Sequence, residues 1–192
     1  MYETCDHPPA VALVGFMGAG KSVVGRELAA ALRSRFLDTD ELIVAQAGPI
    51  EEIFAQRGEA AFRALEAEVV TATVTEAREQ PFVLALGGGA VVSAAVREAL
   101  GRLAHVVWLT APPEVLWRRA RMEGQAVRPL AADEAAFRAL LSTREPLYGQ
   151  VATGVVDTAA KPAATVAAEI AGRLREAPPE DAARRQAQGG VR

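Results

Sequence analysis

The sequence predicts an α/β fold in which helices cover both faces of a parallel sheet. Short, continuously apolar segments alternate with segments that carry apolar residues at helical spacing. Strands that are apolar throughout are typical of a sheet buried on both faces, as parallel sheets are. A glycine-rich segment, Gly15–Gly20, directly follows the first expected strand and precedes a helix. The expected strands lie at residues 10–14, 36–38, 82–86, 106–109 and 155–157.

Helices are expected between these strands, and prolines and glycines set several of their limits. The first begins at Lys21, after which apolar residues recur every four positions on one face. Gly48 and Pro49 separate two later helical segments. Pro112 and Pro113 open another helix, because the N–H that proline lacks has no partner in the first turn. The further expected helices lie at residues 40–47, 50–57, 59–78, 93–100, 133–143 and from 162 onward.

Three segments lack this regular patterning. Residues 1–9 and 176–192 resemble solvated tails, the second of them with two adjacent prolines, two adjacent glycines and paired charges. The folded domain is therefore expected over residues 10–175. Residues 122–132 contain glycine, glutamine and proline with little periodicity. This internal segment is predicted to be a mobile loop.

The composition indicates a single globular domain in the cytoplasm. The chain has 192 residues, of which 51% are hydrophobic and 23% charged, and a formal net charge of −3 that argues against a basic nucleic-acid-binding surface. Its apolar runs are far shorter than the roughly 20 residues that cross a bilayer. The N-terminus lacks the apolar core of a signal peptide, and the single cysteine, Cys5, cannot form an internal disulfide. We expect neither nucleic acid nor a membrane as a partner.

Residues 15–22, which read GFMGAGKS, match the phosphate-binding pattern G-x-x-x-x-G-K-[ST] between a strand and a helix. In such a loop the backbone N–H groups converge on phosphate oxygens, and the positive end of the following helix adds a favourable field. Lys21 is expected to contact the β- and γ-phosphates, and the Ser22 hydroxyl is expected to bind Mg²⁺. The pattern predicts a nucleotide-phosphate site.

Other features narrow the class of nucleotide-binding protein. The chain contains no asparagine, so the Asn-Lys-x-Asp motif with which GTPase switches read guanine cannot occur. A mechanical ATPase would usually be longer and have a strand that ends in Asp-Glu. These observations favour a small-molecule phosphotransferase, which also needs a site for its acceptor.

Asp38 ends the second expected strand and Asp40 follows two residues later, so both carboxylates are expected at the carboxyl edge of the sheet, beside the phosphate loop. One could hold Mg²⁺ through water while the other faces an acceptor hydroxyl. The alternative is structural, with Thr39 or Asp40 capping the helix that follows.

Two further features allow both a functional and a structural interpretation. Arg63 could clamp an anion, or it could pair with Glu59, Glu66 or solvent. Gly87–Gly89, directly after the third strand, could mark a close approach of backbone to a ligand or a plain turn.

Taken together, six motifs make the chain resemble the shikimate kinases over residues 10–175. In order they are GFMGAGKS, LDTD, FRALE, LGGG, RPL and REPLY, and they end at Tyr148. The resemblance implies a P-loop fold of the nucleoside-monophosphate-kinase type, with three α/β/α layers and a five-stranded parallel sheet. Substrate-binding helices are then expected at about residues 39–65 and a lid at about residues 122–132. The implied activity is transfer of the γ-phosphoryl group of ATP to the 3-hydroxyl of shikimate, giving shikimate 3-phosphate and ADP in aromatic amino-acid biosynthesis.

The resemblance also assigns roles to individual residues. Asp40 is implied to bind the shikimate hydroxyls, Arg63 and Arg144 its carboxylate, and Gly88 to offer a backbone N–H. A carboxylate for hydroxyls and planar guanidinium groups for a carboxylate suit a small anionic polyol. Arg144 is expected just after the end of the 133–143 helix. The implied catalytic residues are Lys21, Asp40 and Arg128, the last of them on the lid. The residues implied to bind ATP phosphates are Gly18, Ala19, Gly20, Lys21, Ser22, Val23 and Arg128.

The implied cofactors are ATP and Mg²⁺, with Ser22 and, through water, Asp38 at the metal. The implied partners are shikimate and ATP, and we expect a monomer. Many relatives place an arginine against adenine near the last strand. Residues 157–161 read DTAAK here, which departs from that pattern and leaves Lys161 as at best a substitute for the arginine. Two rival functions are a kinase for another small anion such as gluconate and a nucleotide-dependent regulatory protein without catalysis.

Overall fold

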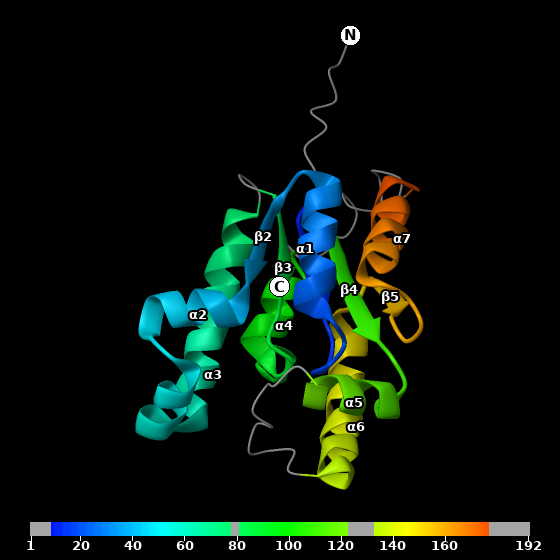
Figure 1. Ribbon diagram of the computed structural model, residues 1–192. Coiled ribbons are helices and arrows are strands. Elements are labelled where there is room, and N and C mark those ends of the chain that lie inside the picture. The colour runs from blue at the N-terminus through cyan, green and yellow to red at the C-terminus, as the bar shows by residue number, and fades with distance from the viewer. Residues whose placement is uncertain (1–8, 78–80, 123–132, 177–192) are drawn as a thin grey trace.

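The computed structural model describes residues 9–77, 81–122 and 133–176. Figure 1 shows a central sheet with helices around it. The sheet has five strands in the order β2-β3-β1-β4-β5, and every neighbouring pair is parallel. The predicted α/β architecture and all five predicted strands are therefore confirmed. The strands are β1 (Val11–Val14), β2 (Arg35–Asp38), β3 (Phe82–Ala85), β4 (His105–Thr110) and β5 (Gly154–Asp157).

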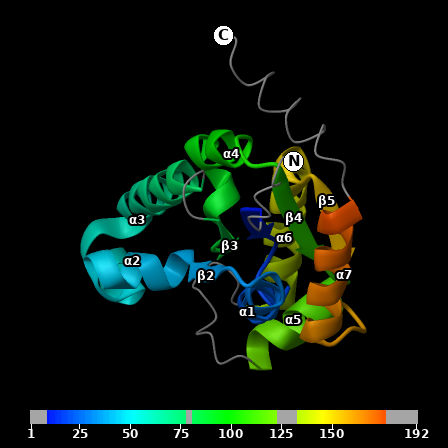
Figure 2. The ribbon, with the colours of Figure 1, turned by 90° about the horizontal axis from the view of Figure 1, so that it is seen from above.

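Helices form the outer layers of the domain. Seen from above, α1 and α7 lie on one side of the sheet and α3 and α4 on the other (Figure 2). The helices are α1 (Lys21–Leu32), α2 (Thr39–Ala47), α3 (Ile50–Glu76), α4 (Ala94–Leu100), α5 (Pro113–Met122), α6 (Glu134–Val151) and α7 (Ala163–Glu176), with a short 3₁₀ helix, η1, at Ala90–Val92. No helix in the described part of the chain is both long and apolar enough to span a bilayer.

The order of the strands brings three segments of the chain to one edge of the sheet. β1 and β3 are fully buried, whereas the outer strands β2 and β5 are partly exposed. In a parallel sheet all carboxyl ends lie on the same side. Because β3 pairs with both β2 and β1, the segments that follow these three strands are neighbours.

Helix α3 consists of two helical runs that meet at Gly58, whose φ of 76° and ψ of 174° are not helical. This kink accounts for the two separate segments predicted at 50–57 and 59–78. Beyond the kink, Phe62 packs with Ile43 of α2 in a small apolar cluster separate from the main core. This packing fixes the second run of α3, which carries Arg63.

The prediction that a helix ends at residue 143 is wrong, because α6 continues through Pro146 to Val151. Proline removes one helical hydrogen bond and normally ends a helix. Here the turns around it carry buried side chains, with Leu141, Arg144 and Tyr148 exposed by 4%, 6% and 1%. Burial on the inner face outweighs the local cost, and Arg144 lies within the helix.

Several predictions fall outside the described residues. Arg128, all of the predicted lid at about residues 122–132 except Met122, and most of the two predicted tails are among them. The helix at Pro113 begins as predicted, and the carbonyl of Pro112 accepts hydrogen bonds from the first turn.

Candidate active site

The phosphate-binding pattern forms a loop between β1 and α1, in the predicted setting. Gly18 and Gly20 have φ values of 77° and 83°, a region that glycine occupies without strain. A Cβ on Gly18 would lie 2.3 Å from the carbonyl oxygen of Leu116 in α5, so the loop is packed tightly against that helix. Lys21 Nζ donates to the carbonyl of Phe16 at 3.0 Å, which holds the ammonium group over the loop.

Ser22 and Asp38 join the start of α1 to the end of β2. Ser22 Oγ donates to Asp38 Oδ2 at 2.7 Å. The other oxygen, Asp38 Oδ1, accepts from the N–H of Asp40 at 3.0 Å and caps α2. The cap is therefore Asp38, not Thr39 or Asp40. The Asp38 carboxylate therefore caps α2 with one oxygen and accepts from the Ser22 hydroxyl, beside the phosphate loop, with the other.

Thr39 connects α2 to the glycine segment, which we define as Gly87–Gly89. Its hydroxyl accepts from the N–H of Gly87 at 2.8 Å, and the residue is fully buried. A Cβ on Gly87 would lie 2.6 Å from Glu66 Oε1 and 3.0 Å from Asp40 Oδ1. The Asp40 carboxylate therefore lies directly against the glycine segment.

Arg63 is held between two glutamates of its own helix, as one interpretation of the sequence suggested. Nη1 donates to Glu66 Oε2 at 2.6 Å and Nη2 to Glu59 Oε1 at 3.4 Å. The Glu66 side chain is fully buried and that of Arg63 is 16% exposed. A Cβ on Gly89 would lie within 2.7 Å of three guanidinium atoms, so Arg63 covers that glycine closely. Pairing within α3 does not remove the guanidinium from the site but fixes it there.

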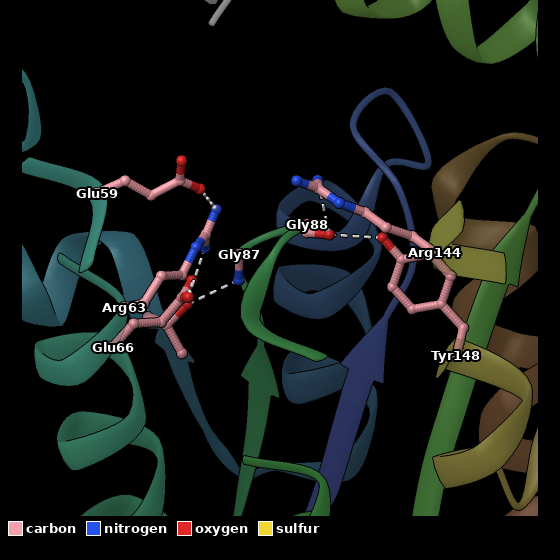
Figure 3. A network of polar contacts seen from close by, with 8 residues as sticks. Glu59, Arg63, Glu66, Gly87, Gly88, Arg144 and Tyr148 are labelled. Atoms are coloured by element: carbon pink, nitrogen blue, oxygen red, sulfur yellow. Dashed lines mark hydrogen bonds and ion pairs between the residues drawn. The ribbon is translucent and has the colours of Figure 1, made fainter. Parts of the chain in front are cut away.

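Arg144 approaches the same segment from α6. Its Nη1 donates to the carbonyl of Gly88 at 3.3 Å, and Tyr148 Oη donates to the same oxygen at 2.5 Å. The guanidinium also lies over the ring of Phe16 in the phosphate loop, 5.6 Å from its centroid. Figure 3 shows the two arginines reaching the glycine segment from different helices.

The acceptor residues and the phosphate loop form one continuous site. A Cβ on Gly88 would lie 3.3 Å from the backbone nitrogen of Met17, so the glycine segment packs against the loop. The structure thus brings together Asp40, Arg63 and Arg144 beside the loop that holds Lys21. The contacts made by Thr39 and Tyr148 were not predicted, whereas the pairing of Glu66 with Arg63 was one of the two interpretations of the sequence.

The segment after β5 is connected to two helices. Lys161 pairs with Glu169 of α7 at 2.5 Å. Arg119 of α5 instead reaches this segment and donates to the carbonyls of Thr158 and Ala159 at 2.7 and 3.1 Å. Lys161 is thus tied to a helix, and the cation that connects α5 to this segment is Arg119.

Comparison with known proteins identifies the family. The family model described as Shikimate kinase matches residues 17–175. The chain belongs to the shikimate kinase family. It is 44% identical to a shikimate kinase of Symbiobacterium thermophilum over 86% of this chain and 96% of the relative. A shikimate kinase of Mycobacterium avium is 46% identical, with 92% of this chain and 97% of the relative covered.

A solved structure extends the likeness to the fold. The shikimate kinase from Acinetobacter baumannii in complex with shikimate superposes with a TM-score of 0.81 at 36% identity, over 89% of this chain and 95% of that one. Membership of a kinase family confirms the predicted phosphotransferase class. The P-loop fold of the nucleoside-monophosphate-kinase type, inferred from motifs, is confirmed as well.

Proposed function

We propose that the chain transfers the γ-phosphoryl group of ATP to the 3-hydroxyl of shikimate. The observation that carries this proposal is the convergence of Asp40, Arg63 and Arg144 on the glycine segment beside the phosphate loop. The two guanidinium groups and the Asp40 carboxylate suit a compact acceptor that has one carboxylate and several hydroxyls.

The two arginines are proposed to bind the shikimate carboxylate. Guanidinium groups present planar pairs of N–H donors that match a carboxylate, and such charge-assisted bonds are among the stronger ones. Arg63 is already oriented by the buried Glu66, and Arg144 by the Gly88 carbonyl and the Phe16 ring. Gly88 is proposed to offer its N–H to the same substrate.

The phosphate groups of ATP are proposed to lie in the loop before α1. Backbone N–H groups of residues 18–23 and the ammonium of Lys21 supply donors and charge there. Arg128 is proposed to add a further cation from the lid. In the described structure Lys21 is held near the loop by the Phe16 carbonyl, which it would exchange for phosphate oxygens.

Mg²⁺ fits the pair formed by Ser22 at the start of α1 and Asp38 at the end of β2. Ser22 and Asp38 place a hydroxyl oxygen and a carboxylate oxygen 2.7 Å apart, and Mg²⁺ prefers oxygen ligands, usually one or two from the protein with the rest from phosphates and water. Ser22 would bind the ion directly and Asp38 through water. When bound, Mg²⁺ offsets the negative charge that develops on the phosphates.

The transfer itself requires positioning and one proton acceptor. Asp40 is proposed to orient the 3-hydroxyl and to take its proton while the hydroxyl oxygen forms a bond to the γ-phosphorus. The bond from that phosphorus to the bridging oxygen breaks, and ADP leaves with the electron pair. No covalent enzyme intermediate is needed.

An assay of ADP release with shikimate, with gluconate and without an acceptor tests the proposal. We expect ADP release in the presence of shikimate and none with gluconate or without an acceptor. Turnover with gluconate instead would favour the rival kinase, and no turnover in any condition would favour a regulatory protein. The monomeric state and the cytoplasmic location stay predictions from the sequence.

The substrate roles are tested with Arg63→Ala and Arg144→Ala. Each truncation removes a charge-assisted contact worth about 1.5–3 kcal/mol, which corresponds to a roughly ten- to hundredfold rise in the shikimate KM. The KM for ATP should change little. If both guanidinium groups hold one carboxylate, the double variant should lose less than the sum. An unchanged shikimate KM in both single variants would remove the proposed acceptor site.

A further inference from the structure

The carbonyl oxygen of Gly88 accepts two hydrogen bonds of unequal length. Tyr148 Oη donates at 2.5 Å and Arg144 Nη1 at 3.3 Å. A carbonyl oxygen has two lone pairs, so it can accept from both donors. The bond from the Tyr148 hydroxyl is much shorter than the bond from Arg144. Figure 3 shows both side chains reaching this oxygen from α6.

Tyr148 packs in the hydrophobic core in addition to donating to the Gly88 carbonyl. The residue is 1% exposed, and its ring lies 5.8 Å from that of Trp108, centroid to centroid. Burial raises the pKa of the phenol well above its usual value, although the neighbouring Arg144 acts in the opposite direction. The hydroxyl therefore keeps its proton at physiological pH and acts as a donor.

We propose that Tyr148 is a positioning residue for shikimate binding, whose hydroxyl fixes the Gly88 carbonyl and thereby sets where the Arg144 guanidinium lies. The proposal rests on the proposed role of Arg144. With the hydroxyl in place, the carbonyl is anchored and the arginine makes only a long bond to it. Without the hydroxyl, Arg144 becomes the main donor to that oxygen, and the guanidinium is drawn toward the backbone and away from a bound carboxylate.

Tyr148→Phe removes the donor and keeps the ring. We expect the shikimate KM to rise roughly three- to tenfold, the range that corresponds to loss of one ordinary hydrogen bond. The KM for ATP and kcat at saturating shikimate should stay close to those of the parent, because Lys21 and Asp40 are untouched. If Tyr148 served stability alone, Tyr148→Phe would lower the melting temperature without raising the shikimate KM relative to the KM for ATP.

The matched control is Thr73→Val. Thr73 is 8% exposed and donates to the carbonyl of Val69 within α3 at 2.8 Å, so this variant also removes one buried hydroxyl bond to a backbone carbonyl. Thr73 lies ten residues along α3 from Arg63, about 15 Å at 1.5 Å per residue. We expect a comparable loss of melting temperature and no change in the shikimate KM.

A double-mutant cycle with Arg144→Ala decides whether Tyr148 acts through the arginine. We expect Tyr148→Phe to raise the shikimate KM in the parent and to have almost no effect in the Arg144→Ala background. The positioning role would be overturned if Tyr148→Phe raised the shikimate KM equally in both backgrounds. It would also be overturned if Tyr148→Phe left the shikimate KM of the parent unchanged while Arg144→Ala raised it. Either result would leave the proposed function intact. An unchanged KM in Arg144→Ala would instead overturn the role of Arg144, and with it this inference.

If Tyr148→Phe does not fold, 3-fluorotyrosine at position 148 gives an equivalent test. The substitution nearly preserves the shape of the ring and changes the strength of its O–H donor. The shikimate KM should then change while the KM for ATP does not, and the change should vanish when Arg144 is alanine. Absence of any change in the shikimate KM would refute the positioning role.

Discussion

A single methyl group on Gly89 tests where the Arg63 guanidinium must lie. A Cβ there would be 2.4 Å from Nη2, 2.6 Å from Nη1 and 2.7 Å from Cζ of Arg63. The φ of −104° and ψ of −6° at Gly89 are accessible to alanine, so the backbone does not resist the change. The guanidinium is the far end of a flexible chain, and it must move by about 1 Å to reach an ordinary contact.

We expect Gly89→Ala to fold and to raise the shikimate KM roughly ten- to hundredfold, because displacing an oriented charge by about 1 Å can cost two orders of magnitude. Gly172→Ala is the matched control. A Cβ on Gly172, inside α7, would meet no atom within 4 Å, so this variant should keep its KM values and gain about 0.5–1 kcal/mol in the free energy of unfolding. Steady-state kinetics and urea unfolding measure both effects. A parent-like shikimate KM in a folded Gly89→Ala variant would refute the placement of Arg63.

Three further predictions concern charge. Lys21→Met should abolish ADP release while the melting temperature stays near that of the parent; activity above a tenth of the parent's would contradict the phosphate-loop assignment. Asp38→Asn keeps an acceptor for the α2 cap but loses the charge. The Mg²⁺ concentration for half-maximal activity should therefore rise, while the free energy of unfolding stays nearly unchanged. Asp38→Ala also removes the cap and should in addition lose about 1 kcal/mol in the free energy of unfolding. The hydrogen bond from Lys161, helped by Arg173, lowers the pKa of Glu169. The stabilisation is therefore present above the ordinary glutamate pKa and is lost as pH falls through the lowered value. Glu169→Gln should be the less stable chain at pH 7, and in thermal melts the difference should close as pH falls through that lowered pKa.

How much of the fold can be predicted depends on whether the signal is local. β1 and β3 are buried on all sides, so their unbroken apolar runs identify them. Pro146 is a local signal as well, and it misleads, because the burial of Tyr148 that keeps α6 helical depends on segments far away in the chain. The 3₁₀ helix at Ala90–Val92 was also not predicted, since three residues are too few to show a period.

The candidate site divides in the same way. The phosphate loop is contiguous in sequence, so its residue types and spacing predict its form. Arg63, in contrast, allowed two interpretations, and the structure shows that its pairing with Glu66 and its place at the glycine segment coexist. The contacts of Thr39 and Tyr148 had no sequence signal, because each hydroxyl bonds to the backbone of a segment that only the tertiary fold brings near.

The strand order explains why three glycines follow β3. Because β3 lies between β2 and β1, its carboxyl end lies between Asp40, which follows β2, and the phosphate loop, which follows β1. Each glycine faces a different group: Gly87 faces the Asp40 carboxylate, Gly88 the backbone of Met17, and Gly89 the Arg63 guanidinium. Side chains at these positions would hold the acceptor residues away from the phosphates. A segment without side chains lets the Asp40 carboxylate, the guanidinium groups and the phosphate loop approach one another closely. In-line phosphoryl transfer between two small molecules requires this proximity.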